Sequence, residues 1–122
     1  MDLNIISEKI LGCAIEVHKV LGAGLLESIY ETALCIELQN KDLKYERQKL
    51  LPVYYKSKKI GDFRIDLVIE NSVLVELKSV ERFDPVFESQ VLSYMKLGKF
   101  KLGLLINFNS RLLKTGIKRY IL

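Results

Sequence analysis

The sequence predicts an α/β fold in which helices flank a mixed central β-sheet, with elements in the order α-α-β-β-β-α-β-β. Apolar residues recur at helical spacing up to Asn40, and apolar and polar residues alternate in the segments between Tyr45 and Lys78. A capped helical segment and the apolar stretch 102–108 then complete a β-α-β unit. With 122 residues and 49% hydrophobic content, the chain suits one compact domain over residues 1–122.

Three segments have the features of helices. The first is marked by a helical apolar repeat and stops near Gly22-Ala23-Gly24; the repeat is Ile6, Ile10, Cys13, Val17 and Val20 or Leu21. A second helix is expected from about Leu25 to Asn40. The third begins at Asp84-Pro85, an N-cap followed by proline at the first helical position, and Gly98 is placed as its C-terminal glycine.

Five segments have the features of strands. The first, Tyr45 to Tyr55, contains Pro52, so we expect it at a sheet edge or with a bulge. A turn at Ser57-Lys58-Lys59 leads into the strand that contains Asp66. Leu102 to Phe108 is almost continuously apolar, as in a strand buried on both faces, and residues 117–122 end the sheet.

The second and third strands predict a specific register. Phe63, Ile65, Leu67 and Ile69 are expected on one face, and Val73, Val75 and Leu77 on the matching face of the next strand. A three-residue loop at 70–72 would pair residues 69 with 73, 67 with 75 and 65 with 77. A two-residue turn would mix the apolar sets. The longer loop sets Asp66 opposite Glu76 and Arg64 opposite Lys78.

Two carboxylates across a ladder repel each other unless a cation lies between them. Mg²⁺ suits such a pair, because it takes oxygen ligands and is held by one or two protein carboxylates together with substrate phosphate. With Lys78 beside them, Asp66 and Glu76 would then serve phosphodiester hydrolysis. The alternative is a charge ladder on a solvated face, in which these two carboxylates pair with Arg64 and Lys78.

Composition limits the other possibilities. The formal net charge is +4, and residues 96–122 contain seven basic residues and no acidic one, which suits either a phosphate-facing surface or scattered solubilising charge. Cys13 and Cys35 have no zinc-like spacing, so we interpret them as reduced core residues. No signal peptide or apolar run of membrane length is present, so we expect a cytoplasmic protein with no membrane partner.

Other polar residues have two interpretations each. Gln90 and Tyr94 share a helix face and could contact a nucleic acid, or serve as a cap and a core residue. Glu27 lies in the first turn of the second helix, where the helix dipole favours an acid whatever its function, and Glu31 competes with it for any site role. His18 could be a further metal ligand or could only stabilise a helix C-terminus.

Together these residues resemble a family. Asp66 and Glu76-Leu77-Lys78 resemble the PD-(D/E)XK nuclease superfamily, and Gln90-x-x-x-Tyr94 resembles the Q-x-x-x-Y element of its RecB-type branch. Gly24-Leu25-Leu26-Glu27-Ser28-Ile29-Tyr30 matches the G-x-x-E-x-x-Y signature of the GxxExxY proteins, small bacterial and archaeal members of that superfamily. The residue before Asp66 is Ile65 where the superfamily pattern has proline, a change that the superfamily tolerates.

The resemblance implies a restriction-endonuclease-like core and a nuclease that uses Mg²⁺, or Mn²⁺ as a substitute, on DNA rather than RNA. Asp66, Glu76, the Leu77 carbonyl and Glu27 would hold the metal, with His18 as a further candidate, and Lys78 would activate water. Substrate contacts would come from Gln90, Tyr94, Tyr30, Lys118 and Arg119. A module that keeps the fold but only binds nucleic acid or a protein remains the alternative. A homodimer is a further option, since resolvase-like relatives cut two strands with two sites.

Overall fold

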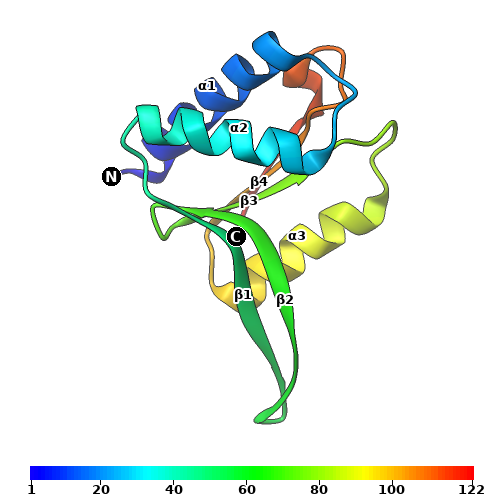
Figure 1. Ribbon diagram of the computed structural model, residues 1–122. Coiled ribbons are helices and arrows are strands. Elements are labelled where there is room, and N and C mark those ends of the chain that lie inside the picture. Colours follow the sequence, from blue (N-terminus) through cyan, green and yellow to red (C-terminus); the bar gives the residue numbers. More distant parts are fainter.

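The computed structural model describes all residues from Met1 to Leu122 and has three layers. Helices α1 (Leu3–Leu21) and α2 (Glu27–Asn40) cover one face of a five-stranded sheet, and α3 (Pro85–Gly98) covers the other (Figure 1). A short 3-10 helix, η1 (Leu113–Gly116), precedes the last strand. The predicted fold class and the order of the predicted elements are confirmed.

The strands follow one another across the sheet in sequence order. They are β1 (Tyr45–Tyr55), β2 (Lys58–Ile69), β3 (Val73–Lys78), β4 (Leu102–Asn107) and β5 (Ile117–Ile121). Only β3 and β4 pair in parallel, through the crossover that contains α3. β1 is an edge strand and shifts register between Val53 and Tyr54, so Pro52 lies in the kind of strand that tolerates a missing donor.

Two apolar cores lie on the two faces of the sheet. The larger contains side chains of α1, α2 and the sheet, and the smaller is centred on Val91 and Met95 of α3. β3 contributes Val73, Val75 and Leu77 to the larger core and Leu74 to the smaller, as its alternation predicted. All six residues of β4 are buried, which confirms a strand covered on both faces.

The predicted alternation of β2 is wrong at its centre. Leu67 and Ile69 belong to the α1/α2 core, but Ile65 belongs to the α3 core, although a regular strand would place Ile65 and Leu67 on one face. The β1–β2 ladder pairs residues 47 with 67 and 49 with 65 and omits both Gln48 and Asp66. Gln48 has a φ of 50°, so the backbone of β1 leaves the extended conformation directly across from Asp66. The apolar faces of the hairpin therefore switch sides at this point.

Some turns and helix ends differ from the prediction. α2 starts at Glu27 rather than at Leu25, and the first hairpin turns at Lys56-Ser57, where both φ values are positive. Gly98 is the last residue of α3 and Lys99 takes the left-handed conformation. Glycine is needed at 98 for another reason, because a Cβ there would lie 2.5 Å from the Phe100 ring.

Other sequence-based expectations agree with the structure. Asp84 caps α3 by accepting a hydrogen bond from the Val86 N–H at 2.9 Å, with Pro85 at the first helical position. Cys13 and Cys35 are buried and form no disulfide. None of the helices combines the length and the apolar character that crossing a membrane would require.

Candidate active site

Asp66 and Glu76 meet where the β2–β3 ladder ends. The ladder contains the predicted pairs 67 with 75 and 69 with 73, but its last pair is Leu67–Val75. Beyond it the backbone N–H of Asp66 donates to Glu76 Oε1 at 3.2 Å, and the N–H of Leu77 donates to Asp66 Oδ2 at 2.8 Å. The expected backbone pairs of 65 with 77 and 64 with 78 are absent from the ladder. The two carboxylates therefore come together through side chains that occupy a gap between the strands.

Glu76 is a buried acid in an unfavourable electrostatic environment. It is 7% exposed, and its burial is the main reason that its pKa rises to about 9. The negative charge of Asp66 raises it further, and the nearby Lys78 ammonium opposes this only in part. Neither Asp66 nor Glu76 forms an ion pair with Arg64 or Lys78. The solvated charge ladder that the sequence left open is thus not what the structure contains.

Lys78 lies on the same face of β3 as Glu76, toward α3. Its Nζ lies 4.5 Å from the centroid of the Phe87 ring, and no carboxylate oxygen comes within ion-pair distance. The ammonium therefore keeps its hydrogen-bond donors available while an aromatic ring limits where it can lie. Such an amine can orient a water molecule or neutralise negative charge that develops beside Glu76.

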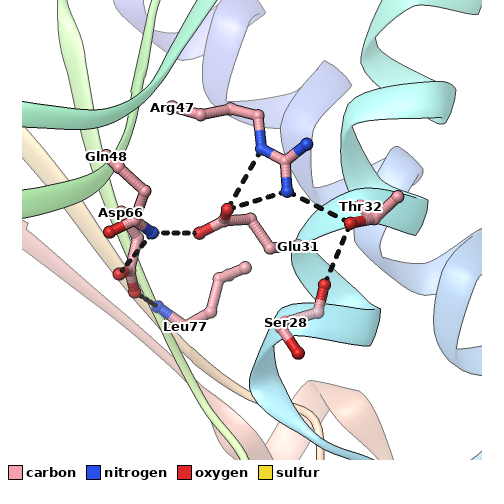
Figure 2. Close-up of polar contacts among 7 residues, drawn as sticks. All are labelled: Ser28, Glu31, Thr32, Arg47, Gln48, Asp66 and Leu77. Carbon is pink, nitrogen blue, oxygen red and sulfur yellow. Dashed lines mark hydrogen bonds and ion pairs between the residues drawn. The ribbon is translucent and has the colours of Figure 1, made fainter.

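A hydrogen-bond network joins α2 to Asp66. Glu31 is buried and accepts from Gln48 Nε2 at 2.7 Å and from Arg47 Nε at 3.1 Å (Figure 2). Gln48 also donates to Asp66 Oδ1 at 3.4 Å, and Arg47 Nη2 reaches the Thr32 hydroxyl at 3.1 Å. The second carboxylate oxygen of Asp66 is held by the Leu77 N–H, so both of its oxygens have protein donors.

The structure distinguishes between Glu27 and Glu31 as the acid of α2 that belongs to the site, a choice that the sequence left open. Glu27 is exposed and lines a hollow of about 360 Å³ together with Leu25, Leu26, Ser28 and Ser79. It has no hydrogen bond to Asp66 or Glu76. Glu31, one turn later on the same helix, is the acid of α2 that connects to Asp66. The predicted metal role of Glu27 thus lacks a supporting contact, and Glu31 has the stronger structural claim.

Tyr94 of α3 lies beside the site. Burial and then the charges of Glu76 and Asp66 raise the pKa of its phenol. Its ring stacks on Phe63 of β2 with centroids 4.0 Å apart. Gln90, one turn earlier on α3, is exposed and forms no side-chain hydrogen bond, so its amide is available to a ligand.

Four predicted site residues lie elsewhere or serve the fold. His18 Nε2 is 2.8 Å from the Ser110 carbonyl oxygen and so joins the end of α1 to the loop after β4. Tyr30 is fully buried; its hydroxyl donates to the Gly22 carbonyl at 2.5 Å and accepts from the Leu25 N–H at 3.1 Å. Tyr30 therefore exposes no surface for the predicted substrate contact, and its hydroxyl instead closes the loop between α1 and α2.

The two basic residues of β5 do not act together. Lys118 lies on the α3 face, where its Nζ is 5.3 Å from the Phe83 ring centroid and 3.9 Å from Glu88 Oε2. Arg119 points toward α1 and donates to Asn4 Oδ1 at 2.5 Å. Because neighbouring residues of a strand face opposite sides, one substrate surface cannot include both.

The donor set at Asp66 and Glu76 fits a magnesium ion. No group of three His, Cys, Asp or Glu side chains lies close enough to hold a metal, so a set that adds Glu27 and His18 is not assembled. The Asp66 and Glu76 carboxylates, with the carbonyl of Leu77 directly after Glu76, would provide oxygen ligands. Mg²⁺ is commonly held by one or two carboxylates with water and phosphate completing its shell. A divalent cation would also remove the repulsion that raises the pKa of Glu76.

Arg47 and Gln48 belong to this site, although the sequence did not single them out. A glutamine does not predict the φ of 50° that Gln48 adopts, because positive φ values are uncommon in residues other than glycine and asparagine. The alternation of apolar residues in β2 could have indicated the irregularity. It did not, because helices cover both faces of the sheet and apolar residues are therefore needed on both sides of the strand.

Comparison with known protein families gives one match. The family model of the PD-(D/E)XK nuclease superfamily matches residues 4–120 of the chain. Comparison with curated proteins and with solved structures gives no match.

Proposed function

Because the chain belongs to the PD-(D/E)XK nuclease superfamily, we propose that it is a metal-dependent nuclease that hydrolyses phosphodiester bonds in DNA. The observation that carries this proposal is the carboxylate pair in the gap between β2 and β3, with Lys78 on the same face as Glu76. The resemblance of Gly24-Leu25-Leu26-Glu27-Ser28-Ile29-Tyr30 to the GxxExxY signature supports the same proposal.

In this proposal Asp66, Glu76 and the Leu77 carbonyl would hold Mg²⁺, or Mn²⁺ in its place. Such an ion would supply Lewis-acid chemistry, activating water and offsetting negative charge on the phosphate. Glu76 has to be ionised to take part, and loss of its proton is favoured when a cation replaces the repulsion from Asp66. Glu31, acting through Gln48, positions the Asp66 carboxylate.

The Lys78 ammonium donates a hydrogen bond that orients the attacking water, and its positive charge stabilises the negative charge that develops in the transition state. The Phe87 ring restricts the ammonium to the α3 face, where its charge acts on Glu76. The amide of Gln90 and the phenol of Tyr94 are hydrogen-bond donors on one face of α3, suited to the phosphate or base of the scissile strand.

The test is cleavage by purified protein of single-stranded, duplex and branched DNA and of RNA, with Mg²⁺ or Mn²⁺. Lys78→Ala and Asp66→Asn should lose at least about 100-fold in rate while their melting temperatures stay near the wild-type value. Lys9→Ala and Asp42→Asn change the same residue types at exposed positions and should cleave normally. Equal cleavage by all five proteins would identify a contaminant and refute the proposal. Binding of DNA without cleavage under every metal condition would instead favour the binding module.

A further inference from the structure

The hairpin of β1 and β2 extends beyond the helical layers as a two-stranded ribbon (Figure 1). We call residues 50–64 the arm. Every residue of the arm is exposed except Leu51, Val53 and Phe63, which are half-buried. A protruding ribbon of this kind adds little to the core, so packing does not determine its side chains and they are available to bind a ligand.

The arm contains most of the net charge of the protein. Its basic residues are Lys56, Lys58, Lys59 and Arg64, and its only acid is Asp62. The arm therefore has a net charge of +3, compared with +4 for the whole chain. Lys59 pairs with Asp62 at 3.2 Å, whereas Lys56, Lys58 and Arg64 have no ion-pair partner. This concentration of charge suits a polyanion and disfavours pairing of two arms from two copies.

Large apolar side chains accompany the lysines. Tyr54 and Tyr55 are 60% and 61% exposed and Ile60 is 66% exposed. Lys56 Nζ lies 5.4 Å from the centroid of the Tyr55 ring. In a ribbon that enters a DNA groove, apolar side chains of this kind can contact base edges such as the thymine methyl group, while the lysines contact phosphates.

The arm is fixed to the candidate active site. β2 runs without a break from Lys58 in the arm to Asp66, and the Phe63–Tyr94 stack holds the base of the arm against α3. At about 3.3 Å per residue, Lys59 lies roughly 23 Å along the strand from Asp66. That span is shorter than one turn of B-DNA, which is about 34 Å. A two-stranded ribbon also fits the major groove of such a duplex.

We propose that the arm binds duplex DNA, entering the major groove with its lysines against the flanking phosphates, and so holds the duplex beside Asp66 and Glu76. The proposal rests on the proposed function, because it takes DNA as the substrate. It adds a binding surface, separate from the residues that would hold metal and water.

The test measures binding without cleavage, by fluorescence anisotropy of a labelled duplex of about 20 base pairs in EDTA over a series of salt concentrations. The triple variant Lys56→Ala, Lys58→Ala, Lys59→Ala should weaken binding by roughly tenfold or more and reduce the slope of log Kd against log salt by about 2 to 3. A control with the same loss of charge on α1 and at the end of α2 should bind as the wild type; its changes are Lys9→Ala, Lys19→Ala and Lys41→Ala.

Equal affinities and slopes for the two triple variants would overturn the proposal, as would tighter wild-type binding to single-stranded DNA of the same length. The cleavage assay distinguishes this failure from failure of the proposed function. If the wild type cleaves and the arm variant binds normally, only the arm proposal fails. If no metal supports cleavage but the arm variant loses binding, the arm stands and the nuclease assignment fails.

Discussion

Replacement of Glu76 by glutamine should change the pH dependence of stability in the metal-free protein. The pKa of Glu76 is about 9 in the folded protein, compared with an ordinary value of 4.5. Between these values the folded state keeps a proton that the unfolded chain releases. The free energy of unfolding therefore falls as pH rises through this window, and the contribution is fully favourable only below the lower value. A glutamine side chain cannot titrate, so the Glu76→Gln variant should lose this slope.

The magnitude follows from the size of the shift. One pKa unit corresponds to about 1.4 kcal/mol, so at pH 7 the buried carboxyl costs the wild type about 3 kcal/mol relative to low pH. The stability difference between Glu76→Gln and the wild type should therefore grow by about 2 to 3 kcal/mol from pH 5 to pH 7. Asp66→Asn should keep the slope but end it at a lower pH, because burial alone, the larger cause, still raises the pKa of Glu76.

The assay is urea unfolding at pH 5, 6, 7 and 8 in EDTA, followed by circular dichroism. A difference between variant and wild type that is constant across this range would refute the account of Glu76. Addition of Mg²⁺ should stabilise the wild type by about 1.4 kcal/mol at ten times its Kd. At one fixed Mg²⁺ concentration the stabilisation should be larger at pH 8 than at pH 5, because Mg²⁺ competes with the Glu76 proton. The same addition should leave Glu76→Gln nearly unchanged, because half of the carboxylate pair is missing.

Three further substitutions, two of them with a control, test packing and hydrogen bonds in the site and the fold. Glu31→Ala should lower stability by about 1 to 3 kcal/mol and reduce cleavage, because it removes the partner of Gln48. Glu27→Ala, at an exposed position, should cost under about 0.5 kcal/mol. Unfolding and rate measurements on both variants decide which acid supports Asp66. Tyr30→Phe should cost about 1 to 3 kcal/mol in urea unfolding while the rate per folded molecule stays unchanged, and a lower rate would return it to the substrate site. Gly98→Ala should cost about 1 to 3 kcal/mol, because the added methyl group overpacks against Phe100. Gly12→Ala has open space around it and should stabilise α1. Equal shifts in melting temperature for the two variants would contradict this packing.

The sequence predicted the parts of the fold that local rules govern. The buried strand at 102–107 and the helix that begins at Asp84-Pro85 follow from hydrophobic pattern and capping chemistry. The loop at 70–72 followed from matching two apolar faces, and the pair of Leu67 with Val75 confirms that register. These features need no information from distant parts of the chain.

Tertiary contacts decided the features that the sequence missed. Glu27 and Glu31 lie four residues apart on one helix face, so periodicity cannot choose between them; the position of Arg47 on β1 makes the choice. The change of face in β2 was hidden because helices cover both sides of the sheet, and the strand needs apolar side chains on each side. Ile65 and Val68 fill one core and Leu67 the other, so the apolar pattern continues through the irregularity.

The irregularity at Asp66 is what allows the two carboxylates to meet. In an unbroken ladder the N–H groups of Asp66 and Leu77 would be bound to backbone carbonyls, and the Asp66 side chain would stand out from one face of the sheet. Here the ladder stops at Leu67–Val75, and each of these N–H groups instead donates to a carboxylate of the other strand. The backbone remains satisfied, and two acids that would otherwise repel are held in contact by hydrogen bonds. The same irregularity in the pairing of β2 that interrupts the period-two pattern therefore brings together the carboxylate oxygens at which we place the metal.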